Sequence, residues 1–273
     1  MKRYRISKFF VNAGQNVARG PFASNAAAEA AKTETLQYLN ARFGEIDIDN
    51  KFNRYMALET PVLSVVEEHT WLLEDICNSY IAGNSYSALT GACCLGERIF
   101  NNIIFKVMDD FKVSPHYKNV YGKASLTNWA YGIRILYDWK IVDEETRKKF
   151  LRLKELRDES IHYQKKDQDL EQISLEAINV VNRLVKALFG LGPERKNVLI
   201  YFEVPGELFL KKDAENNPMA KAFYIPCAVL VGPKHRITSD ETGRLVVSDA
   251  NTYETKDISD AEFVKLRIEQ RAG

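Results

Sequence analysis

The sequence predicts a mainly α-helical protein, an antiparallel bundle of about five helices with a β-rich α+β appendage at its C-terminal end. Between residues 59 and 190, apolar residues recur at helical spacing in five successive stretches. Short polar connections separate these stretches, which favours antiparallel neighbours. After residue 190 the composition changes to β-branched and aromatic runs separated by Pro, Gly and Asn. With 273 residues, 45% of them hydrophobic, the chain can bury a sizeable core and form more than one domain.

The first two predicted helices form a hairpin. Thr60 is the expected N-cap of the first, with Pro61 in its first helical position. The pair Gly83-Asn84 ends this helix, and the stretch "SYSALTGACCLGERIFNNIIFKVMDDF" continues as the second. Its buried face carries small residues early, among them Gly96, which predicts close packing against a neighbouring helix.

Three more helices complete the predicted bundle. The stretch "SLTNWAYGIRILYDW" supplies the third, and the fourth begins at Asp143, where acidic residues suit the positive end of a helix dipole. The fifth is "LEQISLEAINVVNRLVKALFG", which Gly190 is expected to end. Trp129 and Trp139, within or just after the third helix, are expected to pack in the core.

The regions on either side of the bundle are expected to be separate parts. Residues 1–58 contain a strand-like run, "RYRISKFFV", and a capped alanine-rich helix. Whether this region packs with the C-terminal strands is left open. We therefore divide the chain into an N-terminal region (1–58), a helical domain (59–190) and a β-rich region (191–273) that ends in a mixed segment.

Composition excludes several classes of protein. The net charge is +1, so nucleic-acid binding would need a local basic patch. No apolar run approaches the roughly 18 residues of a membrane span, and the basic N-terminus lacks a signal-peptide core. The cysteines are Cys77, Cys93, Cys94 and Cys227. They form no metal-binding pair, and they indicate a reduced, cytoplasmic protein. We predict no metal and no cofactor.

One stretch, "LRLKELRDESIHYQ", departs from amphipathic spacing where it presents Arg157, Asp158 and His162. Asp158 and His162 are four residues apart and share a helix face, so the carboxylate could orient the imidazole. Arg157 lies beside the apolar stripe and therefore needs an acidic neighbour or an anionic ligand. On a straight helix Arg157 and His162 diverge by roughly 140°, so they converge only if the helix ends or bends, or across a dimer.

The place of the Arg157–His162 pair in the chain is more informative than the spacing between the two residues. With 4 histidines in the sequence, an arginine followed by histidine at this spacing is expected roughly 0.7 times by chance. The motif, however, falls at the end of the fourth predicted helix, just before the fifth. Among the other histidines, His69 is expected to be a hydrogen-bonded core residue, whereas His116 and His235 lie in loop-like contexts without partners at ligand spacing.

In these features, residues from about 59 to 190 resemble the HEPN superfamily (higher eukaryotes and prokaryotes nucleotide-binding domains). "LRDESIHY" matches the family's motif of arginine, a polar residue, several variable residues and histidine at Arg157, Asp158 and His162. Family members often carry a polar residue on the second helix facing the motif, and Glu97 in "ALTGACCLGERIF" is the candidate. The flanking regions match no family by inspection.

The resemblance implies a metal-independent endoribonuclease that works as a homodimer and cleaves RNA by attack of its 2′-hydroxyl, in the manner of toxins and antiviral effectors. His162 would be general acid or base and Arg157 would stabilise the phosphorane, with Asp158 and Glu97 orienting them. Lys165 and Lys166, directly after the motif, are candidates for RNA contacts or a solvated turn.

Two alternatives stay open. One is a non-catalytic HEPN module that binds a nucleotide or a protein partner, such as an inhibitor. The other is a helical interaction domain in which Arg157 and His162 are structural and the β-rich region performs recognition.

Overall fold

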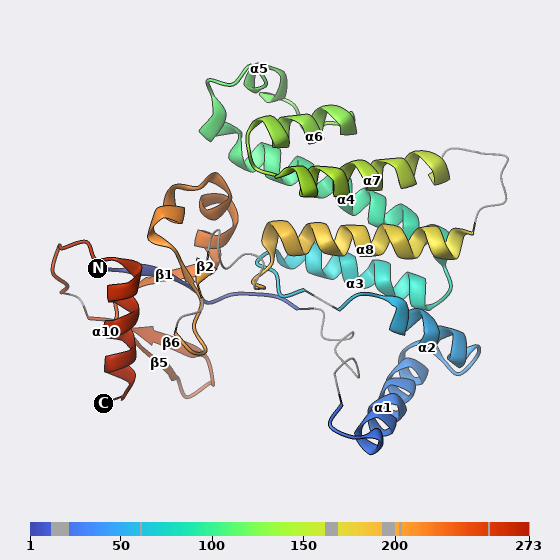
Figure 1. The fold of residues 1–273 in the computed structure, drawn as a ribbon, viewed down its shortest axis with the longest axis horizontal. Coiled ribbons are helices and arrows are strands. Elements are labelled where there is room, and N and C mark those ends of the chain that lie inside the picture. Colours follow the sequence, from blue (N-terminus) through green and yellow to red (C-terminus); the bar gives the residue numbers. More distant parts are fainter. Residues whose placement is uncertain are drawn as a thin grey trace. The chain divides into compact units, whose positions relative to one another are not determined.

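The computed structural model describes residues 1–11, 22–60, 62–159, 169–192, 204–250 and 252–271, and the backbone alone of residues 160–161, 200–201 and 272. Within these ranges the protein is mainly helical, with small antiparallel sheets (Figure 1). The chain divides into two compact units. A helical unit comprises Phe10–Gly190, and a mixed unit combines Met1–Phe9 with Leu191–Gly273. None of the helices described is both long and apolar enough to cross a membrane.

The helical unit consists of helices within residues 59–190 and, before them, of the alanine-rich helix that the sequence analysis expects and a further short helix. Its elements are α1 (Asn25–Phe43), α2 (Ile48–Ala57), α3 (Glu67–Ile81), α4 (Ser85–Val107), the 3₁₀ turn η2 (Met108–Phe111), α5 (Tyr117–Val120), α6 (Trp129–Asp138), α7 (Glu144–Ile161) and α8 (Leu170–Phe189). The alanine-rich helix α1 begins, as expected, at a side-chain cap, since Ser24 accepts from the Ala27 amide. The predicted helical character of residues 59–190 is therefore confirmed at this coarse level.

Helix α4 is the centre of this unit. It packs against α3, α6, α7 and α8, which surround it in Figure 1. Its side chains on these faces are fully buried, among them Leu89, Ile99, Phe100 and Ile103. A helix covered on several sides must be apolar around most of its circumference, and the composition of α4 meets that requirement.

Helix α3 begins later than the sequence predicts. The expected start at Thr60 and Pro61 is wrong, because α3 starts at Glu67. The preceding Ser64 is extended and forms antiparallel bridges with Phe10 and Gly190. In these bridges the backbone N–H and C=O groups of Ser64 form hydrogen bonds outside a helix. The same groups are then not available for helical hydrogen bonds. Pro61 itself lies outside the described residues.

The ends of α6, α7 and α8 follow the sequence. Asn128 caps α6 by accepting from the Tyr131 amide, and Asp143 accepts from the Thr146 amide at the start of α7. Helix α8 ends at Phe189 with Gly190 as its C-cap. A Cβ on Gly190 would overlap the Lys186 carbonyl oxygen, so this position requires glycine.

The mixed unit is built on a four-stranded antiparallel sheet in the order β2-β3-β1-β4. Its elements are β1 (Arg3–Ile6), β2 (Ile200–Tyr201), β3 (Phe209–Leu210), η3 (Lys212–Asn216), η4 (Ala220–Tyr224), η5 (Ile225–Cys227), β4 (Ala228–Val231), β5 (Arg236–Ser239), β6 (Leu245–Ser248) and α10 (Asp260–Ala272). Strands β5 and β6 form a separate hairpin. Phe209, Val231 and Phe263 of α10 share one buried cluster, so α10 packs on the sheet.

The N-terminal strand answers the question that the sequence left open. Strand β1 pairs with β4, with Arg5 opposite Val229, and on its other side with β3. Residues 1–58 are consequently divided between the two units, instead of forming one region. Strand pairing between the two ends of a chain leaves no local pattern in the sequence, since each strand alone is compatible with many partners.

Candidate functional site

The motif arginine lies on α7, on the side that faces α4 and α6. The buried residues Leu153 and Leu156 hold this face of α7 against the bundle. Arg157 is one helical turn after Leu153, and its side chain is 31% exposed. The guanidinium is therefore half-buried at the edge of the core and still reached by solvent.

The indole of Trp129 connects Arg157 to Glu97. The guanidinium carbon of Arg157 lies 5.7 Å from the centroid of the Trp129 ring, a cation–π contact. At the ring edge, Trp129 Nε1 donates a hydrogen bond to Glu97 Oε2 at 2.8 Å. Helices α4, α6 and α7 each contribute one residue to this cluster of Arg157, Trp129 and Glu97. The expectation that Glu97 lies on the side of α4 near the motif agrees with this arrangement.

A glycine allows the three helices to meet here. A Cβ at Gly96 would overlap Leu153 Cδ2 on α7 and lie 3.1 Å from the Trp129 ring on α6. The close packing that the sequence predicts for this face of α4 is present at Gly96. Because Glu97 follows Gly96 directly, the same close approach brings the Glu97 carboxylate to the indole.

Asp158 is engaged on α7 itself. Its Oδ2 accepts from Lys154 Nζ at 2.5 Å, and its Oδ1 accepts from Arg157 Nη1 at 3.3 Å. The Lys154 bond and the nearby Arg157 lower the pKa of the Asp158 carboxyl, which is consequently ionised at neutral pH. The acidic neighbour that Arg157 was expected to need is thus the next residue in the sequence.

A buried thiol lies next to this group. Cys93 precedes Glu97 by one turn of α4 and is 1% exposed. Burial raises the pKa of Cys93 to about 12, while Arg157 opposes that rise through its charge. The thiol is therefore protonated at neutral pH and serves packing, whereas the adjacent Cys94 is exposed.

Three of the predicted site residues lie outside the described residues: His162, Lys165 and Lys166. The structure accordingly brings together Arg157, Asp158 and Glu97. It leaves the expected pairing of Asp158 with His162 as a prediction.

Sequence reasoning missed two features of this region. Trp129 was expected to pack in the core, which it does at 3% exposure, but its role between Glu97 and Arg157 was not foreseen. The partnership of Lys154 with Asp158 was readable, because a spacing of four residues joins opposite charges along a helix.

The other histidines differ in burial and in their contacts. His69 is fully buried, as predicted, and contacts the Phe189 ring and Asn102. His116 Nε2 donates a hydrogen bond of 2.7 Å to Asp138 Oδ2 at the end of α6, a partner that the sequence analysis overlooked. His235 lies, as expected, in a loop, directly before β5, but it is 1% exposed and its ring contacts Phe209 in the core of the mixed unit.

Comparisons with known proteins add no further constraint on this site. No family model, no curated protein and no solved structure matches the chain.

Proposed function

We propose that the helical unit is a HEPN-type endoribonuclease that cleaves RNA without a metal ion, through Arg157 and His162. The observation that carries this proposal is the placement of Arg157. Its guanidinium is held on the Trp129 ring, beside Glu97, and keeps 31% of its side chain exposed five residues before His162. A guanidinium held on an aromatic face and still reached by solvent is placed to bind an anionic group.

The proposed reaction is transesterification within the RNA chain. The 2′-oxygen bonds to the adjacent phosphorus, the bond from phosphorus to the 5′-oxygen breaks, and a 2′,3′-cyclic phosphate remains. One imidazole accepts the 2′-hydroxyl proton and another donates a proton to the leaving 5′-oxygen. Arg157 stabilises the added negative charge on the phosphorane oxygens with its planar donors.

Glu97 and Asp158 are positioning residues in this proposal. Glu97 holds the Trp129 indole through the bond to Nε1, and the indole in turn supports Arg157. Asp158 restrains Arg157 Nη1. Neither carboxylate is required to carry a proton.

A homodimer would supply the second imidazole. On a straight helix Arg157 and His162 would diverge, so a partner chain is the simplest source of a facing histidine. Mixing wild-type protein with an excess of His162→Ala protein then tests the arrangement. If each site needs an imidazole from both chains, mixed dimers are inactive and the variant suppresses the wild-type activity, whereas sites confined to one chain predict that the wild-type activity is kept.

The primary test is RNA cleavage in EDTA by the wild type and by the Arg157→Ala and His162→Ala variants. Each variant should lose roughly 10²–10⁴-fold in rate. Arg147→Ala is the matched control, because Arg147 lies on the same helix and pairs with Glu144. A substrate with a 2′-deoxy sugar at the cleaved position should resist cleavage. Wild-type protein that leaves single-stranded and structured RNAs intact would overturn the proposal.

A second candidate is a non-catalytic HEPN module that binds a nucleotide or protein partner. It is favoured by the state of Asp158, because both carboxylate oxygens already accept hydrogen bonds from cations. Such a carboxylate is a weak orienting group for His162. Binding of RNA without cleavage, weakened by Arg157→Ala and unaffected by His162→Ala, would support this candidate.

A further inference from the structure

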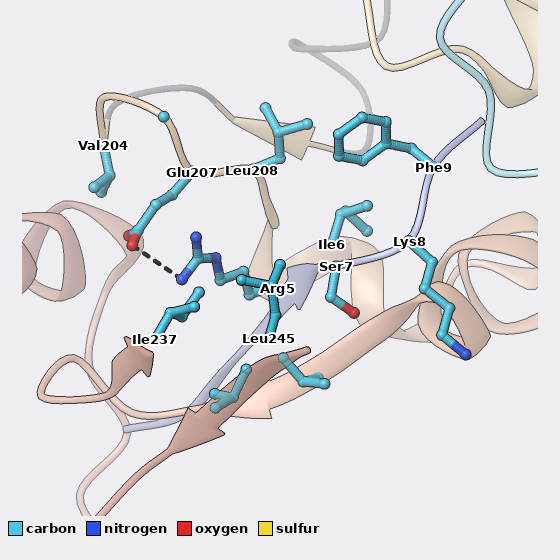
Figure 2. Close-up of a pocket in the computed structure, with 13 residues that line it drawn as sticks. Arg5, Ile6, Ser7, Lys8, Phe9, Val204, Glu207, Leu208, Ile237 and Leu245 are labelled. Atoms are coloured by element: carbon cyan, nitrogen blue, oxygen red, sulfur yellow. Dashed lines mark ion pairs between the residues drawn. The ribbon is translucent and has the colours of Figure 1, made fainter. Parts of the chain in front are cut away.

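The mixed unit contains a cavity of about 730 Å³. It lies between β1 with the turn before β3 on one side and the β5–β6 hairpin on the other, so a single unit provides all its walls. Figure 2 shows Arg5 between Glu207 and Leu208 on one side and Ile237 and Leu245 on the hairpin side. This volume falls within the range of small-molecule sites, about 300–1,000 Å³.

The hairpin wall is apolar and partly open. Ile237 pairs with Val247, and Leu245 lies two residues before Val247 on the same face of β6. All three line the cavity, and Leu245 is 73% exposed. Val246 points to the opposite face and does not line it. A hairpin that turns apolar side chains toward an open cavity provides a surface for an apolar ligand.

The polar wall is an ion cluster. Arg267 of α10 donates two hydrogen bonds to the Glu207 carboxylate, from Nε to Oε2 at 2.9 Å and from Nη2 to Oε1 at 2.7 Å. Arg5 Nη1 lies 3.1 Å from Glu207 Oε1. The buried guanidinium of Arg267 and the half-buried one of Arg5 therefore share one carboxylate, and the Glu207 side chain that carries it is 5% exposed.

The neighbouring histidine adds no charge to this cluster. His235 Nδ1 lies 2.8 Å from the Gly232 carbonyl, which accepts only, so Nδ1 carries the ring proton. Nε2 then presents its lone pair to Arg5 Nη1 at 2.9 Å. Burial and the two arginines also lower the pKa of His235, in agreement with a neutral ring.

The cluster consequently carries one uncompensated positive charge at the cavity. Arg267 already neutralises Glu207 through a bidentate pair, which leaves Arg5 in excess. Arg5 lines the cavity, whereas Arg267 does not, and its side chain is 13% exposed. Burying a cation without a counter-charge of its own costs free energy. Burial accordingly lowers the pKa of Arg5, because it disfavours the charged form. Lys8, the other cation of the lining, is exposed and extends away from Arg5 in Figure 2.

We propose that this cavity binds a small amphipathic carboxylate, with its carboxylate on Arg5 and its apolar body between Ile6, Val229 and the hairpin. A monoanion matches the single excess charge. The planar guanidinium suits a carboxylate, since the two groups form parallel hydrogen bonds. The proposal concerns the mixed unit alone and does not depend on ribonuclease activity.

The test is calorimetric titration of the full chain with linear carboxylates from hexanoate to decanoate. Octanoate should bind at one site per chain with a dissociation constant below about 1 mM. Each added methylene should tighten binding by roughly three- to fourfold until the cavity is full. Octanamide, which has the same length without the charge, should bind at least about tenfold more weakly.

Two pairs of variants locate the site. Arg5→Gln should weaken octanoate binding by roughly tenfold or more, while Arg236→Gln, which removes an exposed arginine outside the cavity lining, should not. Leu245→Glu should weaken it as well, because the new charge faces the cavity. Val246→Glu adds the same charge on the opposite face of β6 and should leave affinity unchanged.

Three results would overturn the proposal. One is the absence of binding for every carboxylate of the series to the folded wild type. Another is octanamide binding as tightly as octanoate, which would indicate a purely apolar site. The last is an equal loss of octanoate affinity in Leu245→Glu and Val246→Glu. Because this comparison does not involve Arg5, it tests the proposal even if Arg5→Gln fails to fold.

Discussion

Trp129 donates its indole N–H to Glu97 at 2.8 Å, and this bond links a predicted site residue to a residue predicted only to pack. The face of the same ring contacts Arg157, with its guanidinium carbon 5.7 Å from the ring centroid. A change at Glu97 is therefore transmitted to Arg157 through one aromatic ring. The cluster depends on the geometry of three helices, α4, α6 and α7.

The first prediction separates the hydrogen-bonding role of Glu97 from its charge. Glu97→Gln keeps an oxygen that accepts from Trp129, so its free energy of unfolding should change by less than about 1 kcal/mol. Glu97→Leu leaves the indole N–H of Trp129 without this acceptor and should cost about 1–3 kcal/mol. Urea denaturation measures both values, and Arg98→Gln, which alters an exposed neighbour paired with Glu68, serves as control.

RNA cleavage by the same variants gives a second readout. If Glu97 acts by positioning, Glu97→Gln should retain most of the wild-type rate, whereas Glu97→Leu should lose activity together with stability. A large loss of rate in a fully stable Glu97→Gln protein would contradict the positioning role and assign a function to the charge itself.

Much of the helical unit was predictable because its signals are local. The cap of Ser24, the acidic start of α7 and the glycine after α8 act within one helical turn, and the sequence shows each of them. The start of α3 was mispredicted for the opposite reason. Ser64 pairs with Phe10 and Gly190, which are far away in the sequence.

In the candidate site, too, local features were predictable, whereas contacts between residues far apart in the sequence were not. Arg157 and Asp158 were singled out as candidates by residue type and position, Glu97 was a candidate through the family resemblance, and Lys154 was available from its spacing to Asp158. The contact of Arg157 with Trp129 depends on how α6 crosses α7, which no periodicity in either helix specifies. The cluster of Arg5, Glu207, His235 and Arg267 joins the two ends of the chain and left no trace in the sequence pattern.

The second prediction concerns the close approach at Gly96. Gly96→Ala gains about 1 kcal/mol of helix propensity but forces a methyl group against Leu153, for a net loss of about 1–2 kcal/mol. Leu153→Ala alone should cost about 2–5 kcal/mol through its cavity. The double variant should be more stable than the sum by about 1–2 kcal/mol, because the new methyl occupies that cavity.

Gly91→Ala is the matched control for this cycle. A Cβ at Gly91 would meet Ile76 on α3, 2.8 Å away, and not Leu153. Combining Gly91→Ala with Leu153→Ala should therefore give additive losses within about 0.5 kcal/mol. Additivity in the Gly96 pair as well would show that Gly96 and Leu153 do not compete for the same space.

The third prediction uses the adjacent cysteines as a probe of α4. Cys94 is exposed, whereas Cys93 and Cys77 are buried. A maleimide at pH 8 should label Cys94 in the folded protein and reach Cys93 only on unfolding, since burial raises the pKa of Cys93 to about 12. Peptide mass spectrometry assigns the labelled site. Equal labelling rates at Cys93 and Cys94 would show that α4 does not hold Cys93 inside the bundle.

The fourth prediction concerns stability at mildly acid pH. Burial, with smaller contributions from Arg98 and Lys106, lowers the pKa of His69 to about 4. The unfolded chain protonates this histidine near its usual pKa of about 6.5, so between these values the unfolded state binds the extra proton. The free energy of unfolding should therefore fall as the pH decreases from about 6.5 to 4, by about 3 kcal/mol in total from this residue.

His69→Leu removes this titration and keeps an apolar side chain against Phe189. Its unfolding free energy should vary less with pH than that of the wild type across the same window, and the difference should end near pH 4. His116→Gln, which changes the histidine directly before α5 that pairs with Asp138 of α6, should keep the wild-type dependence attributed to His69. Equal slopes for the wild type and His69→Leu in urea denaturation between pH 6.5 and 4 would show that the folded protein protonates His69 as readily as the unfolded chain does.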